Sequence, residues 1–324
     1  MTRWCGWREA ADRALYGPEG FYRSTSSRPA DHFRTSVHAS PLFARAIARL
    51  AAETGLRAVV DIGAGRGELL TALARWDPEL TLTGVELVDR PKGLPDAVQW
   101  VDELPAGLDA LVVANEWLDN VPVDVVEQSA DGPRLVLVDE NGAESLGGRP
   151  ASADLAWLDR WWPLVEQGER AEVGRPRDET WSGMLRRLDR GVALAIDYAH
   201  TRAGRPPYGS LTAYRDGRQV AAVPDGSCDI TAAVALDSCA AAGVAAGGAD
   251  TRLLPQRDAL RLLGVAGDRP PHELAESDPA AYLAALRDAG EAAELTDRGG
   301  LGAFTWLIQA VGMPVPGVLV DHGR

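Results

Sequence analysis

A glycine-rich turn flanked by acidic residues is the part of this sequence best suited to hold a small ligand. Gly63, Gly65 and Gly67 lie between an apolar run that ends in Asp61 and Ile62 and a helical pattern that begins directly afterwards. Glycine allows the backbone to approach a ligand without a Cβ in the way. A phosphate would gain from the helix N-terminus without a nearby acid, so Asp61 favours a cationic ligand. A glycine turn without any ligand is the alternative.

The spacing of this turn separates two kinds of nucleotide binding. A dinucleotide-binding fold prefers Gly-x-Gly-x-x-Gly or Ala, and the sixth position here is Glu68. The pattern is instead Gly-x-Gly-x-Gly with an acid two residues ahead. It resembles the first motif of S-adenosylmethionine-dependent methyltransferases, which implies that Asp61 lies near the amino-acid part of that cofactor. By the same resemblance Asp102 takes the position that meets the adenine amino group, and Glu103 beside it is equally able to accept.

A second acid extends the ligand site. Glu86 closes the second apolar run, about twenty residues beyond the glycines. An acid at that place can accept both ribose hydroxyl protons, which supports nucleoside binding in either chemistry. A solvated acid at the end of a strand is the alternative.

The polar pair Asn115-Glu116 follows the fourth apolar run, with Asp119 three residues later. Ligands of open α/β sheets bind beyond the carboxyl ends of the strands, so this pair is placed to face a methyl sulfonium. Methyl transfer is an in-line displacement that requires an aligned nucleophile and stabilised charge. If the acceptor is an arginine, its guanidinium stays protonated and Glu116 could hold it bidentately. The alternative role of Glu116 and Asp119 is to cap the next helix.

The elements around these motifs predict an α/β fold with a parallel sheet covered on both faces. Ser40-Pro41 begins a helix that Gly55 ends. Strands are expected at 58–62, 81–85, 97–101, 109–114, 191–197 and 302–311, with a hairpin between 123–126 and 134–138. Helices are expected at 152–165, 178–189, 230–242, 256–263 and 279–289. An ordered loop is expected at 16–22 and a long structured loop at 200–228.

The composition indicates an ordinary globular protein. Apolar residues make up 46% of the 324 residues, and a net charge of −14 is unsuited to tracking nucleic-acid phosphates. No run of about 18 apolar residues and no apolar h-region are present, so neither a membrane span nor a secretory signal is expected. The three cysteines are widely spaced and odd in number, which fits a reducing cytoplasm. Five scattered histidines predict no metal site.

Further stretches, taken in order, resemble the MidA family of methyltransferases, which is related to a mitochondrial complex I assembly factor that methylates arginine. The matching stretches are residues 16–22, 33–36 with 40–41, the glycine turn, Asn115-Glu116 with Asp119 and Pro122, 196–198, and 229–231. The sequence departs from the family pattern at Val37-His38, at Ala199, and at Ala233 and Ala235, all on the side of the methyl acceptor.

The resemblance implies a Rossmann-like class I methyltransferase sheet with an N-terminal helical segment and an added helical and hairpin region that shapes an acceptor cleft. Thr35 and Ser36 would then line the site of S-adenosylmethionine. Four segments are expected: an N-terminal loop and helix forming part of the cleft (1–55), the cofactor-binding half of the core (56–122), an inserted hairpin and helices (123–190), and the remaining core sheet with added loop and helices (191–324).

Four functions remain open at this point. The leading one is methyl transfer to a protein arginine, with Glu116, Asn115 and Asp119 as catalytic residues. The acceptor-side departures leave a small molecule or a peptide as the second possible acceptor. The third is a cofactor-binding assembly protein that transfers nothing, and the fourth, a nicotinamide oxidoreductase, is weakened by Glu68. A homodimer is left open, and no nucleic-acid or membrane partner is expected.

Overall fold

The structure, a computed structural model, describes residues 3–23, 35–248 and 250–320, and the chain forms two compact units. The first unit comprises Met1–Phe33, Glu116–Arg186 and Asp197–Gly247, and the second comprises Arg34–Asn115, Arg187–Ile196 and Gly248–Arg324. The chain therefore passes repeatedly between the two units, and neither unit coincides with one of the four continuous segments expected from the sequence. Each unit has a sheet and a buried apolar cluster of its own.

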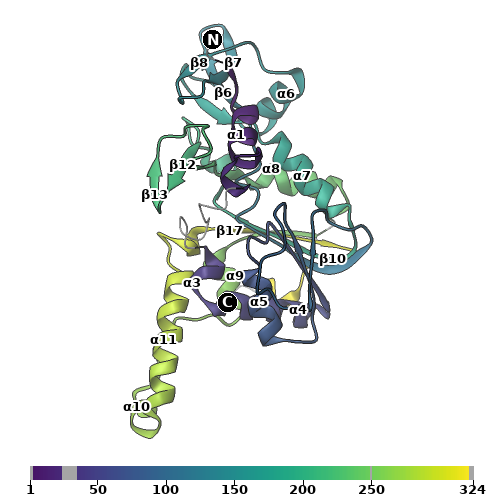
Figure 1. The fold of residues 1–324 in the computed structure, drawn as a ribbon, viewed down its shortest axis with the longest axis vertical. Coiled ribbons are helices and arrows are strands. Elements are labelled where there is room, and N and C mark those ends of the chain that lie inside the picture. The colour runs from purple at the N-terminus through teal and green to yellow at the C-terminus, as the bar shows by residue number, and fades with distance from the viewer. Residues whose placement is uncertain (1–2, 24–34, 249, 321–324) are drawn as a thin grey trace. The chain divides into compact units, whose positions relative to one another are not determined.

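The second unit contains a seven-stranded sheet, which confirms the predicted α/β class (Figure 1). Its strand order is β16-β17-β10-β5-β2-β3-β4. The strands are β2 (Ala58–Ile62), β3 (Thr81–Val85), β4 (Val98–Val101), β5 (Leu108–Asn115), β10 (Leu188–Asp197), β16 (Asp250–Pro255) and β17 (Thr305–Val311). The five strands from β10 to β4 run parallel, whereas β16 pairs antiparallel with β17. Strands such as β5 are continuous apolar runs because a parallel sheet is buried on both faces.

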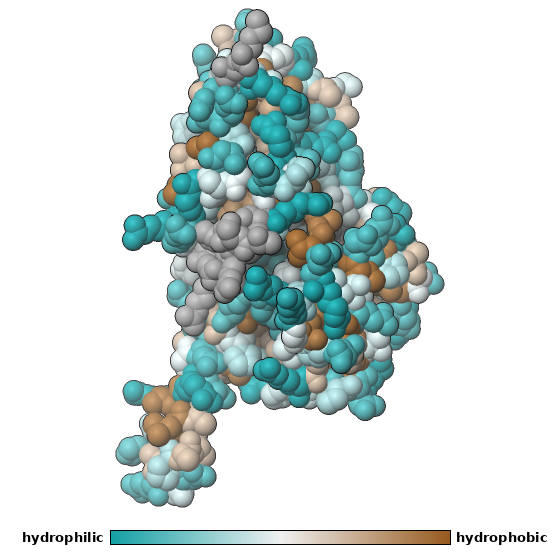
Figure 2. Space-filling model, viewed as in Figure 1, coloured by the Kyte–Doolittle hydropathy of each residue, from teal (hydrophilic) through white to brown (hydrophobic). Residues whose placement is uncertain are grey.

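Helices complete the second unit. They are α3 (Ser36–Ala39), α4 (Pro41–Thr54), α5 (Glu68–Trp76), α9 (Gln256–Leu262), α10 (His272–Ser277) and α11 (Pro279–Leu295), with 3₁₀ turns η3 (Leu301–Ala303) and η4 (Gly317–Leu319). The predicted start and end of α4 are confirmed: the Ser40 hydroxyl accepts the N–H of Leu42, and Gly55 ends the helix with φ +68°. An apolar patch lies on α11, where Leu283 and Leu286 are exposed (Figure 2).

The first unit is built mainly from short strands. Its largest sheet has the order β1-β7-β6-β9, with β8 paired to β7. These strands are β1 (Cys5–Gly6), β6 (Val125–Ser129), β7 (Gly132–Val138), β8 (Glu144–Leu146) and β9 (Arg170–Glu172). The smaller sheets are formed by β11 (Ala199–His200) with β15 (Val234–Ala235), and by β12 (Thr212–Arg215) with β13 (Arg218–Val220) and β14 (Asp229–Thr231). The helical elements are α1 (Trp7–Tyr16), η1 (Phe21–Arg23), α6 (Ser152–Trp161), α7 (Arg175–Leu185), η2 (Arg202–Gly204) and α8 (Leu236–Ala245).

The sequence predictions were wrong in two places and incomplete in a third. The ordered loop expected at 16–22 joins α1 to η1, but α1 itself was not predicted, although its buried residues follow helical spacing: Trp7, Ala10, Ala11, Ala14 and Leu15. The long loop at 200–228 contains η2, β12 and β13. The alanine-rich helix expected from 230 begins only with α8, because the residues before it pair with β12 and β11, and such long-range pairing overrides local helix propensity.

Candidate active site

The glycine turn has the geometry that requires glycine. Gly63, Gly65 and Gly67 all have positive φ, at +67°, +57° and +77°. The turn is held against the end of β3, because the N–H of Gly63 donates to the carbonyl of Val85 over 3.0 Å. A Cβ added to Gly67 would also overlap the side chain of Leu94. The turn can therefore present bare backbone to a ligand at the N-terminus of α5.

Acidic side chains gather beside this turn. Glu86 accepts the N–H of Gly65 at 2.9 Å through Oε2 and that of Leu87 at 2.7 Å through Oε1. Asp61 is buried at the end of β2, and its pKa is raised well above the usual value by burial and then by the charges of Glu68 and Glu86. Three acids crowded at one place disfavour a phosphate, whereas an ammonium or a sulfonium would stabilise their ionised forms, in line with the cationic ligand that the sequence predicts.

The segment before α4 also reaches the turn. The Thr35 hydroxyl lies 2.7 Å from Nδ1 of His38, and the other ring nitrogen of His38 lies 3.4 Å from Glu68. Burial raises the pKa of Glu68, but hydrogen bonds from His38 and from the backbone outweigh it and lower the pKa overall. Ser36 is fully buried instead, and its hydroxyl pairs with the amide of Gln256. The cofactor roles of Thr35 and Ser36 remain predictions.

Asp102 lies directly after β4 and is exposed, as is Glu103 beside it. β4 is the edge strand of the sheet and is paired with β3, at whose end Glu86 lies. Both acids are therefore accessible to a ligand, and the structure does not distinguish between them. The adenine contact of Asp102 remains a prediction.

Residues 115–122, which we call the acceptor segment after the role that the sequence predicts for them, begin with an unusual backbone conformation. Asn115 is the last residue of β5, and Glu116 directly after it has φ +53°. In the described part of the chain only Asp216 shares this left-handed conformation among residues other than glycine. Such a conformation costs free energy for a residue with a Cβ and persists where the surroundings enforce it, often at functional sites. The residues that follow Glu116 are anchored by buried polar contacts.

Asp119 is one of the groups that fix the segment. Only 6% of its surface is exposed, so it is a buried group. Its Oδ2 accepts the hydroxyl of Thr231 at 2.9 Å. The carboxylate of Asp197, at the end of β10, accepts the backbone N–H groups of Leu118 and Asp119 at 3.4 Å each. The side chain of Asp119 is therefore anchored in the interior of the first unit, and its catalytic role remains a prediction.

Arg177 on α7 binds the same segment, although no pattern in the sequence indicated it. Its buried guanidinium donates to the carbonyls of Asp119 and Val121 on one side and to those of Ala232 and Ala233 on the other. The charge of this arginine is thus distributed over backbone oxygens of two segments. Nothing in the local sequence around Arg177 distinguishes it from the other arginines, because its partners are more than fifty residues away.

The aromatic residues Tyr16 and Tyr22 of the N-terminal motif bind the same segment. Tyr16 donates to the carbonyl of Asn120 at 3.0 Å, and its ring stacks on that of Tyr22 with centroids 5.6 Å apart. Tyr22 is hydrogen-bonded to Asp229, which also accepts the side-chain amide of Asn120 at 3.0 Å. Burial and then the charge of Asp119 raise the pKa of Asp229 to about 7. Four of the stretches noted in the sequence thus meet in the first unit: 16–22, 119–122, 196–198 and 229–231.

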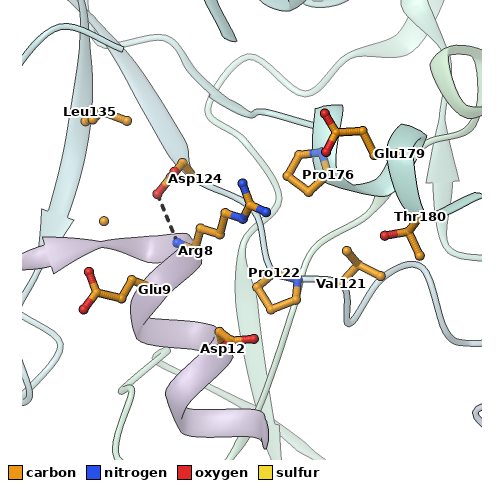
Figure 3. A pocket seen from close by; sticks show the side chains of 11 residues that line it. Arg8, Glu9, Asp12, Val121, Pro122, Asp124, Leu135, Pro176, Glu179 and Thr180 are labelled. Carbon is orange, nitrogen blue, oxygen red and sulfur yellow. Dashed lines mark hydrogen bonds between the residues drawn. The ribbon is translucent and has the colours of Figure 1, made fainter. Parts of the chain in front are cut away.

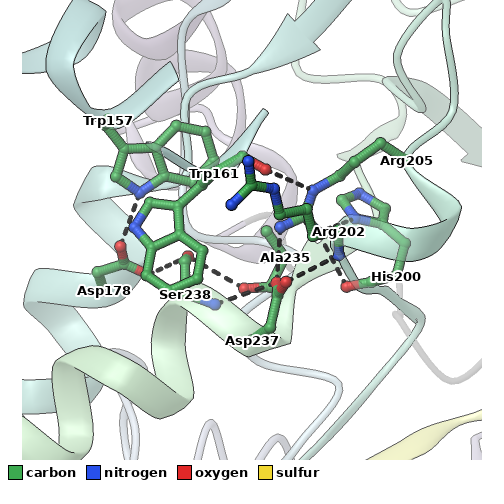
Figure 4. A network of polar contacts seen from close by, with 9 residues as sticks. All are labelled: Trp157, Trp161, Asp178, His200, Arg202, Arg205, Ala235, Asp237 and Ser238. Carbon is green, nitrogen blue, oxygen red and sulfur yellow. Dashed lines mark hydrogen bonds and ion pairs between the residues drawn. The ribbon is translucent and has the colours of Figure 1, made fainter. Parts of the chain in front are cut away.

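A second polar network lies in the first unit and includes His200 (Figure 4). Arg205 donates to Nδ1 of His200 at 2.7 Å and to Asp237 at 2.6 Å. Because a guanidinium only donates, Nδ1 is the accepting nitrogen and Nε2 carries the proton. Burial and then the positive charge of Arg205 lower the pKa of His200 to about 4, so the ring is neutral at neutral pH. His200 is therefore part of the packing against Trp162, whose ring centroid lies 4.6 Å away.

An open cavity of about 750 Å³ occupies another face of the first unit (Figure 3). Val121 and Pro122, at the end of the acceptor segment, form part of its wall. The side chain of Arg8 extends along the cavity, and its backbone N–H donates to Asp124 at 3.1 Å. Acidic residues outnumber this single cation in the lining: Glu9, Asp12, Asp124 and Glu179.

Other site chemistries receive little support from the described residues. Among them no group of three or more histidine, cysteine or acidic side chains is arranged to hold a metal ion. Cys5, Cys228 and Cys239 are buried thiols, and burial is the first cause that raises the pKa of Cys239 well above its usual value. Of the described helices, none is both long and apolar enough to cross a membrane.

Comparison with known proteins decides the family. Residues 77–254, more than half of the chain, match the model of a family described as "Putative S-adenosyl-L-methionine-dependent methyltransferase". The chain belongs to this family. The matched part of this methyltransferase begins after the glycine turn and contains the acceptor segment, Arg177, Asp197 and Asp229. No curated protein matches the chain significantly.

Two solved structures resemble this methyltransferase over nearly its whole length. One is a COG1565 superfamily member from Burkholderia thailandensis, described as a "likely methyl transferase" and bound to S-adenosyl-homocysteine. It is 28% identical, with a TM-score of 0.76, and the match covers 95% of this chain and 88% of that one. The other, an uncharacterized COG1565 superfamily protein from the same organism, is 27% identical with a TM-score of 0.77, over 99% and 91% of the two chains.

The cofactor is S-adenosylmethionine, as the sequence predicted. The residues of this chain fit it. Three glycines with positive φ leave the backbone of the turn bare, and Gly67 lies where a Cβ would collide with Leu94. Asp61 and Glu86 place two carboxyl groups beside the turn, and burial raises the pKa of each. A cationic ligand at this place would favour their ionised forms. When bound, the cofactor supplies an activated methyl group on a sulfonium.

Proposed function

We propose that this methyltransferase transfers the methyl group to an arginine side chain of a protein, as the resemblance to the MidA family implies. The observation that carries the proposal is Glu116, which directly follows β5 and is held in a left-handed conformation. Glu116 is half-buried, whereas Asp119, the other acid of the acceptor segment, is buried. A carboxylate in this place can bind a guanidinium through two parallel hydrogen bonds, which also fixes the nitrogen that attacks.

The residues of the site would divide the work. Asp61, Gly63, Gly65, Gly67, Glu86, Asp102, Thr35 and Ser36 would hold the cofactor. Glu116 would bind and orient the acceptor, with Asn115 next to it at the end of the strand. Asp119 would position Glu116 through the backbone that joins them, because its own side chain is buried and cannot reach the acceptor. Correct alignment of the acceptor is worth a large part of the rate enhancement in a displacement reaction.

The charge of the first unit supports a cationic acceptor. Four acids and one arginine line the cavity whose wall includes Val121 and Pro122, a few residues after Glu116. An excess of carboxylates attracts a positively charged peptide and repels an acidic one. The net charge of −14 favours the same partner.

The proposal is tested by incubating the protein with methyl-labelled S-adenosylmethionine and an extract of its source cells. The label is then separated by size and the labelled fraction is hydrolysed. We expect label on arginine in a discrete protein band and a loss of at least about a hundredfold in rate for Glu116→Ala, because such losses follow when a group that orients the transition state is removed. Asp131→Asn, an exposed turn residue, serves as the control and should retain the wild-type rate.

Three other outcomes contradict the proposal. Label found only in small molecules or short peptides would assign a different acceptor, which the departures at Ala199, Ala233 and Ala235 also allow. Binding of S-adenosyl-homocysteine without any transfer would indicate an assembly protein. Full activity of Glu116→Ala would show that Glu116 does not bind the acceptor, which removes the observation on which the arginine proposal depends.

A further inference from the structure

Two buried carboxyl groups face each other beneath the acceptor segment. Asp197 is fully buried, and Asp119 is exposed by only 6%. The side chains are within hydrogen-bond reach of each other. Oδ2 of Asp119 accepts from Thr231, whereas Oδ1 is buried and has no hydrogen-bond donor among the described residues if both carboxyls are ionised. A carboxylate oxygen that is buried without a donor is costly, so a donor is expected at this place.

The cations around the pair do not supply that donor. Arg177 is the nearest buried cation, and its N–H groups donate to four backbone carbonyls instead of to either carboxylate. No salt bridge to Asp119 or Asp197 is formed by the described residues. Because Arg177 forms no ion pair with either carboxylate, its single charge offsets only part of the repulsion between two adjacent carboxylates in a medium of low dielectric constant.

We propose that Asp197 and Asp119 share one proton and that this acid–carboxylate pair is the positioning device of the acceptor segment. The proton lies between Asp197 and Oδ1 of Asp119 and satisfies the oxygen that otherwise has no donor. Asp197 continues to accept the backbone N–H groups of Leu118 and Asp119. The same side chain therefore binds both the backbone of the segment and the carboxyl group of Asp119. Its effect on methyl transfer rests on the proposed role of Glu116, two residues before Leu118.

The direction of the pH dependence follows from the charges that face the pair. Burial and then the charge of Asp119 raise the pKa of Asp197 well above its usual value. Because the folded-state pKa is raised, the stabilising proton is present at low pH and is lost as the pH rises through that pKa. The other charged or titratable groups around the pair are Arg177 and Cys239 from the helices, Glu172 and Asp229 from the strands, and Glu116, Tyr198 and Tyr22 from the connecting segments.

Neutral variants of Asp197 distinguish a pair that shares one proton from a pair in which both carboxyl groups are ionised. Asp197→Asn has the shape of the protonated acid, and its amide can donate to Asp119 at every pH. Asp197→Ala removes all hydrogen bonds of this side chain. We measure transfer of labelled methyl to the extract, hydrogen exchange at the amides of Leu118 and Asp119, and thermal unfolding, each from about pH 5 to about pH 10. Asp131→Asn is the control for the exchange of an acid for its amide.

We expect the wild-type rate to fall about tenfold per pH unit above the apparent pKa of the pair, together with the protection of the two amides. Asp197→Asn should keep activity and lose this alkaline decline, Asp131→Asn should retain it, and Asp197→Ala should be impaired at every pH. The proposal is overturned if Asp197→Asn shows the same alkaline decline as the wild type, or if it is as impaired as Asp197→Ala. Exchange and unfolding need no methyl acceptor, so they still decide the proposal if transfer to arginine fails.

Discussion

The glycine turn and the acceptor segment are two functional regions built in different ways. The turn is a continuous stretch in which Gly63, Gly65 and Gly67 supply the conformation and Glu68 begins the helix. The residues of the acceptor segment do not favour its backbone conformation by their types, and the positive φ of Glu116 is unfavourable for a residue with a Cβ. Its shape comes from buried polar groups that are distant in sequence. The conformation of the glycine turn can therefore be predicted from the sequence, whereas the conformation of the acceptor segment depends on contacts with the rest of the first unit.

The largest expected effect breaks the support of the acceptor segment. Arg177→Met keeps the length of the side chain but leaves four carbonyls without their donor and the buried acids without their cation. We expect the free energy of unfolding to fall by about 3–5 kcal/mol, as for other buried charges that lose a partner. Chemical denaturation measures it. The matched control is Arg190→Met, because Arg190 forms an exposed ion pair with Asp109 that is worth at most about 1 kcal/mol. Equal losses in the two variants would contradict a special role of Arg177.

The next effect concerns pH. Because burial and the charge of Asp119 raise the pKa of Asp229 to about 7, its ionisation opposes folding. The stability that the protonated form gives is complete below about pH 4 and is lost as the pH rises to about 7, which corresponds to an upper value of about 4 kcal/mol. Asp229→Asn should therefore gain stability relative to the wild type across this interval. A parallel pH dependence of unfolding in the two proteins would show that Asp229 ionises normally.

The smallest effect tests the local region. Gly67→Ala introduces a Cβ at φ +77° and against Leu94. We expect a loss of about 1–3 kcal/mol in the binding free energy of S-adenosyl-homocysteine, measured by calorimetry, with little change in the acceptor segment. Gly148→Ala is the control, because Gly148 has open space around its Cβ position. Unchanged affinity for Gly67→Ala would mean that the turn does not approach the cofactor.

Local signals predicted much of the fold. Ser40 and Gly55 marked the two ends of α4, and the apolar runs marked β2 and β3 at their observed bounds. The helix expected from 230 was wrong because β14 and β15 are stabilised by partners outside the segment. The compact units could not be predicted, since each combines three separate parts of the chain.

For the site, the sequence determined the residue types that bind a cofactor, because a positive φ at Gly63, Gly65 and Gly67 and an acid after a strand are properties of a few neighbouring residues. Tertiary structure decided that Asp119 is buried, that Arg177 binds the same segment and that Asp197 lies against Asp119. Burial and the pKa of a carboxyl group are set by atoms that surround it in space. The elements that carry these atoms are brought together only by the folded chain.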